Sequence, residues 1–110
     1  MIEDGAFVPS LWPAEVANGL LSAQRSGRLS ETELTEAIDL FRPLKIEVDY
    51  QDRKSYIERL IALGTKYSLT SYDASYLELA LRAKLPLATH DKPLSRAARK
   101  AGVRLFFKRA

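Results

Sequence analysis

The chain has 110 residues, of which 46% are hydrophobic and 28% are charged, as in an ordinary globular protein of one domain. It contains no cysteine, which excludes disulfides and thiolate metal sites, so any metal must be held by oxygen atoms or by the one histidine, His90. No apolar run approaches the roughly 18 residues of a membrane span, and the N-terminus lacks a signal-like pattern. We therefore expect a soluble, cytoplasmic protein that makes no use of a membrane.

The net charge is only +3, but the positive charges are unevenly distributed. The last nineteen residues hold seven cations and no acid. Such a region can attract phosphate backbones, and the alternative is a solvated helix face followed by a basic tail. The seven residues are Lys92, Arg96, Arg99, Lys100, Arg104, Lys108 and Arg109.

Apolar periodicity and capping residues divide the chain into alternating strands and helices. The apolar run Ala6–Pro9 is typical of a strand that ends at its proline, after which Ser10 is expected to cap a helix. Ser30 and Glu33 form a capping-box pattern at the start of a second helix, and Ser71 is a good N-cap for the helix that ends at Ala83. In chain order we expect a strand Ala6–Pro9, a helix between Ser10 and Gly27, a helix between Ser30 and Pro43, a strand Lys45–Val48, a helix from about Asp52 to Tyr67, a helix from Ser71 to Ala83, a strand Leu85–Thr89, a helix from Pro93 to Gly102 and a strand Val103–Phe107.

This order of elements predicts an α/β fold. Helices separated by single short strands favour a parallel sheet, here of about four strands, that is flanked by helices on both faces. Since no linker, repeat or low-complexity tract is visible, we expect residues 1–110 to form one domain.

Three acids fall where such a sheet would gather them along one edge. Asp91 follows a predicted strand by two residues, and Glu15 and Asp73 fall in the first turns of predicted helices. Each acid alone is explained by capping or by the helix dipole. Together they suit Mg²⁺ or Mn²⁺, which take oxygen ligands and can activate water for phosphodiester cleavage. Thr89 could hydrogen-bond to the carboxylate of Asp91 and orient it.

Three blocks of the chain, in their order and spacing, resemble the PIN-domain family and specifically VapC-type toxins of toxin–antitoxin pairs. The blocks are Val8–Asn18, Leu69–Tyr76 and Leu85–Leu94, and Ala98–Val103 resembles the usual ending. The resemblance implies a Mg²⁺- or Mn²⁺-dependent endoribonuclease with four acids, a homodimer and a cognate antitoxin that covers the active edge. Carried over by position, Glu15, Asp73 and Asp91 match three of the acids, and Thr89 matches the hydroxyl residue beside the last.

The chain departs from the family pattern at its start. Members begin with a central strand that carries an aspartate, and a helix follows before the strand that here is Phe7–Val8. Glu3 and Asp4 lie in the connector and do not replace that acid. Without the central strand, the strands at Phe7 and Leu87 would flank a gap with two open edges. We expect these edges to pair with a second copy by strand exchange or sheet completion, unless the chain is a truncated product.

The sequence therefore predicts a VapC-like ribonuclease whose activity is weakened by the loss of one ligand. Glu15, Asp73 and Asp91 would hold the metal, and a basic group would contact the RNA backbone. The alternative is a catalytically inactive PIN-like module that pairs with itself or titrates an antitoxin, and a third interpretation is a gene remnant. The basic group comprises Lys92, Arg96, Arg99 and Lys100.

Overall fold

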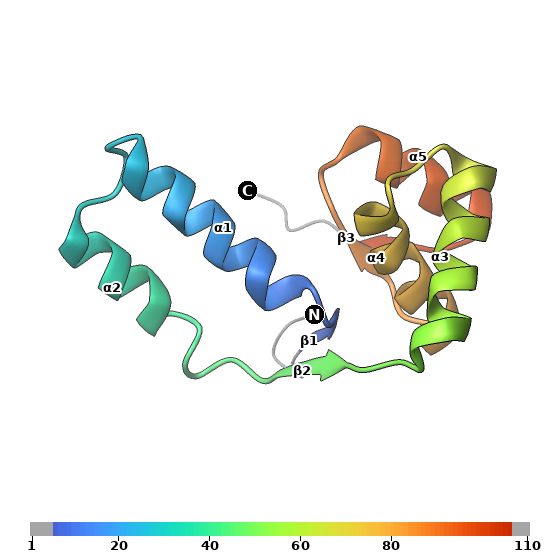
Figure 1. The fold of residues 1–110 in the computed structure, drawn as a ribbon, viewed down its shortest axis with the longest axis horizontal. Coiled ribbons are helices and arrows are strands. Elements are labelled where there is room, and N and C mark those ends of the chain that lie inside the picture. The colour runs from blue at the N-terminus through green and yellow to red at the C-terminus, as the bar shows by residue number, and fades with distance from the viewer. Residues whose placement is uncertain (1–5, 107–110) are drawn as a thin grey trace. The chain divides into compact units, whose positions relative to one another are not determined.

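A computed structural model describes residues 6–106, and every structural statement below concerns those residues. They form an α/β fold whose elements follow the predicted order (Figure 1). The chain divides into two compact units, with the boundary between Val48 and Asp49. In chain order the elements are β1 (Ala6–Pro9), α1 (Trp12–Arg25), α2 (Glu31–Asp39), β2 (Ile46–Asp49), α3 (Arg53–Tyr67), α4 (Ser71–Ala83), β3 (Leu87–Ala88), α5 (Lys92–Ala101) and β4 (Leu105–Phe106).

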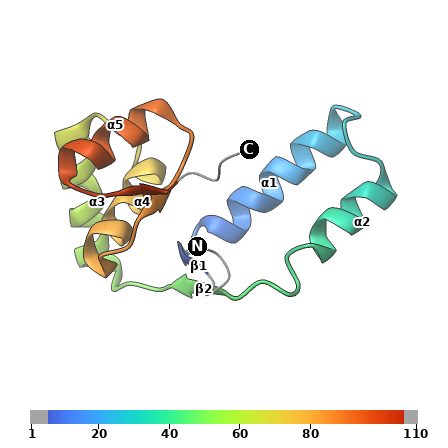
Figure 2. The ribbon, with the colours of Figure 1, turned by 180° about the vertical axis from the view of Figure 1, so that it is seen from behind.

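The first unit contains β1, α1, α2 and most of β2. The strands β1 and β2 form a two-stranded sheet, and the Ala6 amide donates to the Lys45 carbonyl at 2.7 Å. The helix α2 runs back alongside α1 (Figure 2), and the Trp12 and Phe41 rings meet edge to face with centroids 5.8 Å apart. Neither α1 nor α2 has a buried residue. The two helices of this unit therefore contribute partly exposed apolar contacts, whereas Val8 and Pro9 of β1 are buried.

Two of its helix starts test the predicted caps. Ser10 does not cap α1, because the residue at the cap is Leu11, which offers no side-chain acceptor, so that prediction is wrong. The capping box of α2 is confirmed: the Ser30 amide donates to Glu33 Oε1 at 2.9 Å, and the Glu33 amide donates to Ser30 Oγ at 3.1 Å. Two hydrogen bonds with Ser30 lower the pKa of the Glu33 carboxyl. The bond from the Ser30 amide has the larger effect, and the bond with the Ser30 side chain has the smaller one.

The second unit contains the buried core. The helices α3 and α4 pack together, α5 packs on α4, and β3 pairs with β4 in parallel, with Leu87 opposite Leu105. This pairing confirms the predicted parallel strands, although each is shorter than expected, and Phe107 lies outside the described residues. The core comprises Leu77, Ala80, Leu87, Leu94, Ala97, Ala98 and Val103.

The helix ends of this unit follow local capping chemistry. Asp52 caps α3, as its side chain accepts from the Ser55 amide. The cap of α4 is Thr70 and not Ser71, one residue earlier than predicted, because the Thr70 hydroxyl accepts from the Asp73 amide. Gly102 ends α5 at φ +82°, a left-handed conformation that glycine adopts without steric cost.

The described strands form two two-stranded sheets, β1–β2 and β3–β4. None of the described helices is long and apolar enough to cross a lipid bilayer.

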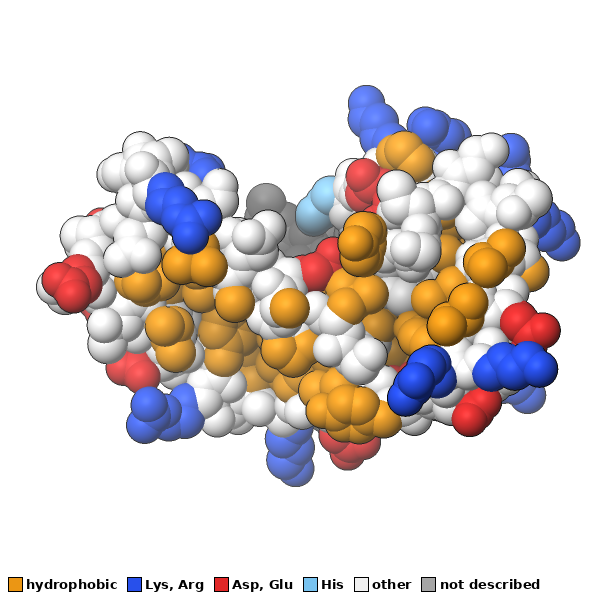
Figure 3. Space-filling model, viewed as in Figure 1, with side chains coloured by type: hydrophobic (Ala, Val, Ile, Leu, Met, Phe, Trp, Pro, Cys, Tyr) orange, Lys and Arg blue, Asp and Glu red, His pale blue; other side chains and the backbone are white. Residues whose placement is uncertain are grey.

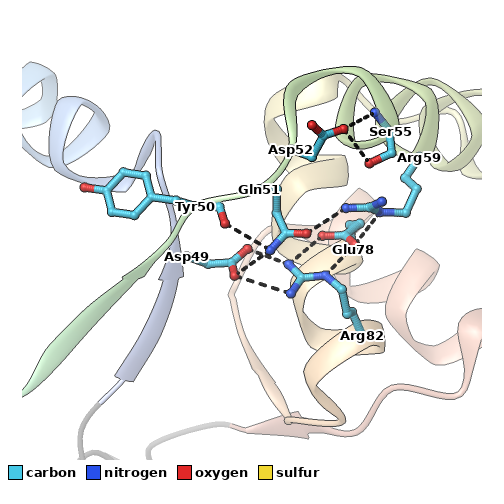
Figure 4. A network of polar contacts seen from close by, with 8 residues as sticks. All are labelled: Asp49, Tyr50, Gln51, Asp52, Ser55, Arg59, Glu78 and Arg82. Carbon is cyan, nitrogen blue, oxygen red and sulfur yellow. Dashed lines mark hydrogen bonds and ion pairs between the residues drawn. The ribbon is translucent and has the colours of Figure 1, made fainter.

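A network of ion pairs fixes the end of β2 to α3 and α4 (Figure 4). Arg82 of α4 donates to Asp49 and, from Nε, to Glu78 Oε2 at 2.8 Å; Arg59 of α3 donates to the same Glu78 oxygen at 2.9 Å and to Gln51 at 2.9 Å. The hydrogen bonds to Glu78 and then to Asp49 raise the pKa of the Arg82 guanidinium. The network thus keeps two nearly buried carboxylates paired within the second unit.

Candidate functional site

Asp91 lies at the junction between β3 and α5, where the sequence places the last acid of the site. It is the N-cap of α5, and its Oδ2 accepts from the Leu94 amide at 2.9 Å. The Thr89 hydroxyl accepts from the Asp91 amide at 3.0 Å. Thr89 thus fixes the backbone of Asp91, whereas we expected it to orient the carboxylate. Asp91 itself is exposed, so its charge remains accessible to a ligand.

Asp73 lies in the first turn of α4, in the same unit as Asp91. It is half-buried, and its amide is held by Thr70 at 3.1 Å. The helices that carry these two acids pack against each other through the core of the second unit. Both carboxylates therefore stand at helix starts, where the free amides and the helix dipole favour an anion.

Glu15 is exposed in the first turn of α1 and belongs to the first unit. Within residues 6–106, no group of three or more acidic or histidine side chains is gathered closely enough to hold a metal ion. The oxygen donors of the three acids are of the type that Mg²⁺ and Mn²⁺ take, and Mg²⁺ is often held by one or two carboxylates with water and substrate phosphate. The chemistry of the donors thus fits a hard cation.

The predicted basic residues line the exposed side of α5. A hollow of about 460 Å³ lies beside the cap and is lined by His90, Lys92, Ser95, Arg96 and Arg99. Lys92, Arg96 and Arg99 are spaced by four and then three positions, so they share one helix face, and Figure 3 shows Lys and Arg side chains gathered over α5. This face presents cations directly next to Asp91, an arrangement that can hold an anion near the carboxylate.

The sequence did not single out Lys66, which lines a second hollow against α5 together with Arg96 and Lys100. A lysine in the last turn of a helix is ordinary, because it complements the helix dipole. Only the packing of α3 and α5 around the shared core shows that Lys66 and Lys100 face the same hollow.

Comparisons with known proteins give consistent results. A family model described as PIN domain matches residues 1–100. The chain is 35% identical over 89 residues to ribonuclease VapC1 of Mycobacterium tuberculosis, covering 81% of this chain and 65% of that protein. It is 38% identical over 88 residues to ribonuclease VapC3 of Pyrobaculum aerophilum, covering 74% of this chain and 62% of that protein.

Among solved structures, the crystal structure of PAE2754 from Pyrobaculum aerophilum superposes with a TM-score of 0.63 at 19% identity, covering 84% of this chain and 85% of that one. This likeness supports the fold alone. The chain spans less than two thirds of the length of the two ribonucleases that it matches.

Proposed function

The chain belongs to the PIN-domain family and is homologous to VapC ribonucleases, and from this premise we propose that it is a VapC-type endoribonuclease toxin that hydrolyses RNA phosphodiester bonds with a divalent cation, Mg²⁺ or Mn²⁺. The observation that carries the proposal is the family match over residues 1–100, within which Asp91 stands at a helix cap beside a basic face. A toxin of this type acts in the cytoplasm on RNA and is held inactive by a cognate antitoxin.

In this proposal Glu15, Asp73 and Asp91 hold the cation. When bound, a divalent cation supplies an activated water and stabilises the charge that develops on the phosphoryl group. Thr89 keeps the Asp91 backbone in place through its 3.0 Å hydrogen bond, so that the carboxylate stays at the start of α5. The basic face of α5 contacts the RNA backbone, with Lys92 nearest the Asp91 cap and Lys100 farthest along the helix. That face comprises Lys92, Arg96, Arg99 and Lys100.

An Asp91→Asn variant tests the catalytic assignment. Asparagine caps helices about as well as aspartate, so α5 keeps its start while the anionic ligand is lost. We expect metal-dependent RNA cleavage to disappear with little change in thermal unfolding. The matched control is Asp52→Asn, which alters the N-cap aspartate of α3 and should leave cleavage unchanged. Equal cleavage by the Asp91 and Asp52 variants would contradict the assignment.

A second candidate is a PIN-like binding module without catalysis. It is favoured by the structural role of Asp91, whose Oδ2 accepts a hydrogen bond from the Leu94 amide as the N-cap of α5. A carboxylate with this capping role is explained without a metal ion. A Mg²⁺ or Mn²⁺ titration separates the two candidates. Saturable binding with RNA cleavage, even slow cleavage, supports the ribonuclease, whereas RNA or antitoxin binding without cleavage supports the module.

A further inference from the structure

A second basic hollow lies between the C-terminal end of α3 and α5. Its volume is about 710 Å³, and no acidic side chain of residues 6–106 lines it. Its polar lining consists of Lys66 and Ser68 from one side and Arg96 and Lys100 from the other, with the ring of Tyr67 beside them. Ammonium, guanidinium and hydroxyl groups can all donate to phosphate oxygens. The hollow therefore has the chemistry of an anion site.

The three cations of this hollow take no part in the ion pairs formed among residues 6–106. The ion pairs of the described residues use Arg42, Arg59 and Arg82, and none of them involves a cation of the hollow. Lys66 is instead positioned by an aromatic ring, because its Nζ lies 5.4 Å from the centroid of Tyr67. A cation over an aromatic face keeps its full charge and can still bind a phosphate.

Arg96 joins this hollow to the one beside Asp91, because its side chain lines both. Lys92 lies four positions before Arg96, and Lys100 four positions after it, so the three cations follow one another along α5. A polyanion that begins at the cap of α5 can therefore cross Arg96 and continue toward Lys66 without leaving positively charged surface.

We propose that the hollow between α3 and α5 binds the phosphodiester backbone of the RNA substrate beyond the cleavage point, with Lys66 and Lys100 as the groups that bind its phosphates. The inference rests on the proposed function for the identity of the ligand. The continuity with the Asp91 hollow favours a long polyanion over a single phosphate ion. The RNA cleavage proposed at Asp91 makes RNA the polyanion expected there.

Fluorescence anisotropy with a labelled single-stranded RNA of mixed sequence tests the inference. An RNA about 12 nucleotides long matches the usual size of a binding site for single-stranded nucleic acid. The binding is measured in the Asp91→Asn background, which prevents cleavage, at several salt concentrations. Replacing Lys66 and Lys100 by alanine should weaken binding roughly tenfold at 0.1 M salt and reduce the salt slope by about 0.7 for each phosphate that the protein no longer neutralises. The matched control is Lys54→Ala, an exposed lysine of the same helix about 18 Å from Lys66 along its axis.

Unchanged affinity and salt slope in the Lys66/Lys100 variant would overturn the inference, and Asp91-dependent cleavage would then leave the proposed function standing. If the unaltered chain does not cleave RNA but the same variant still weakens binding, the inference stands and the catalytic proposal fails. A glutamate-rich peptide of matched charge is the competing probe. Equal loss of its binding in the variant would overturn the assignment to RNA.

Discussion

Arg82 neutralises two carboxylates that are almost inaccessible to water. The side chains of Glu78 and Asp49 are 4% and 7% exposed, and both pair with Arg82, whose own side chain is 32% exposed. Replacing Arg82 by methionine leaves two poorly hydrated anions close together with one fewer partner. Removal of one member of a buried ion pair leaves the other charge without its partner. We therefore expect a loss of about 3 kcal/mol in the free energy of unfolding, measured by urea denaturation.

The control for this prediction is the exposed pair between Arg42 and Asp39, whose side chains are 81% and 56% accessible. Its removal by Arg42→Met should change stability by less than about 0.5 kcal/mol, because surface ion pairs contribute little. A comparable loss in both variants would show that burial does not govern the energy of the Arg82 network.

Interactions between residues distant in the sequence could not be predicted from the sequence, whereas local ones could. Asp49 and Arg82 are 33 positions apart, and nothing in their neighbourhoods marks them as partners. Asp91, by contrast, was predicted at the end of a strand and lies at the junction of β3 and α5, because both the strand pattern and Pro93 are local signals. The role of Lys66 could not be predicted for the same reason as the Arg82 network, because its neighbours in the hollow are distant in the sequence.

At the scale of elements, the capping box of α2 makes the start of that helix sensitive to pH. Hydrogen bonds from Ser30 lower the pKa of Glu33, so its contribution to α2 is present above the ordinary value of 4.5 and is lost as the pH falls through the lower folded value. A ¹³C NMR titration should find the Glu33 midpoint below 4.5. In a Ser30→Ala variant, which loses one of the two bonds, the midpoint should move upward.

A Glu33→Gln variant is the matched control, because glutamine completes a capping box without titrating. In it, the signal of the Ser30 amide, which donates to Glu33 Oε1, should respond less to pH over the carboxyl range than in the unaltered chain. A Glu33 midpoint at or above 4.5 in the unaltered chain would contradict the prediction.

The C-terminal end of α4 carries a lysine in a conformation that suits glycine. Lys84 has φ 56° and ψ 46°, and its amide donates to the Ala80 carbonyl. Since a side chain at this left-handed position is strained, Lys84→Gly should stabilise the chain by about 0.5 to 1 kcal/mol in thermal or urea unfolding. Lys84→Ala removes the same charge without relieving the backbone, so it should bring no gain. An equal gain in both variants would assign the effect to charge.

The caps of the helices show how precisely sequence patterns predict the residue at which a helix begins. The box of Ser30 and Glu33 was predicted because its two members are three positions apart and each satisfies the other. The cap of α4 was assigned one residue too late, because Thr70 and Ser71 are adjacent and chemically equivalent acceptors. Ser10 is not the cap of α1, because the helix begins at Trp12 and Leu11 occupies the cap position. The presence of a nearby hydroxyl group does not determine at which residue a helix begins.

At the scale of the whole molecule, the two units differ in how they cover apolar side chains. The buried core cluster lies entirely in the second unit, whereas α1 and α2 have no buried residue. Figure 3 shows hydrophobic side chains gathered over these two helices, and Ile38 and Leu40 are 52% and 73% exposed. Exposed apolar surface of this kind is typical of interaction sites. It supports the expectation, drawn from the family resemblance, that the protein forms a homodimer.

Light scattering coupled to size exclusion tests the homodimer. Because one chain has a mass of 12.4 kDa, a dimer should elute with twice that mass, 24.8 kDa. Ile38→Glu places a charge on the exposed apolar side of α2 and should shift the population toward the monomer at equal concentration, since an interface core excludes unpaired charges. The control is Ile61→Glu, at an isoleucine of α3 that is 62% exposed in the second unit. A well-folded monomer at every concentration would contradict the homodimer, and equal dissociation in both variants would place the interface elsewhere than on α2.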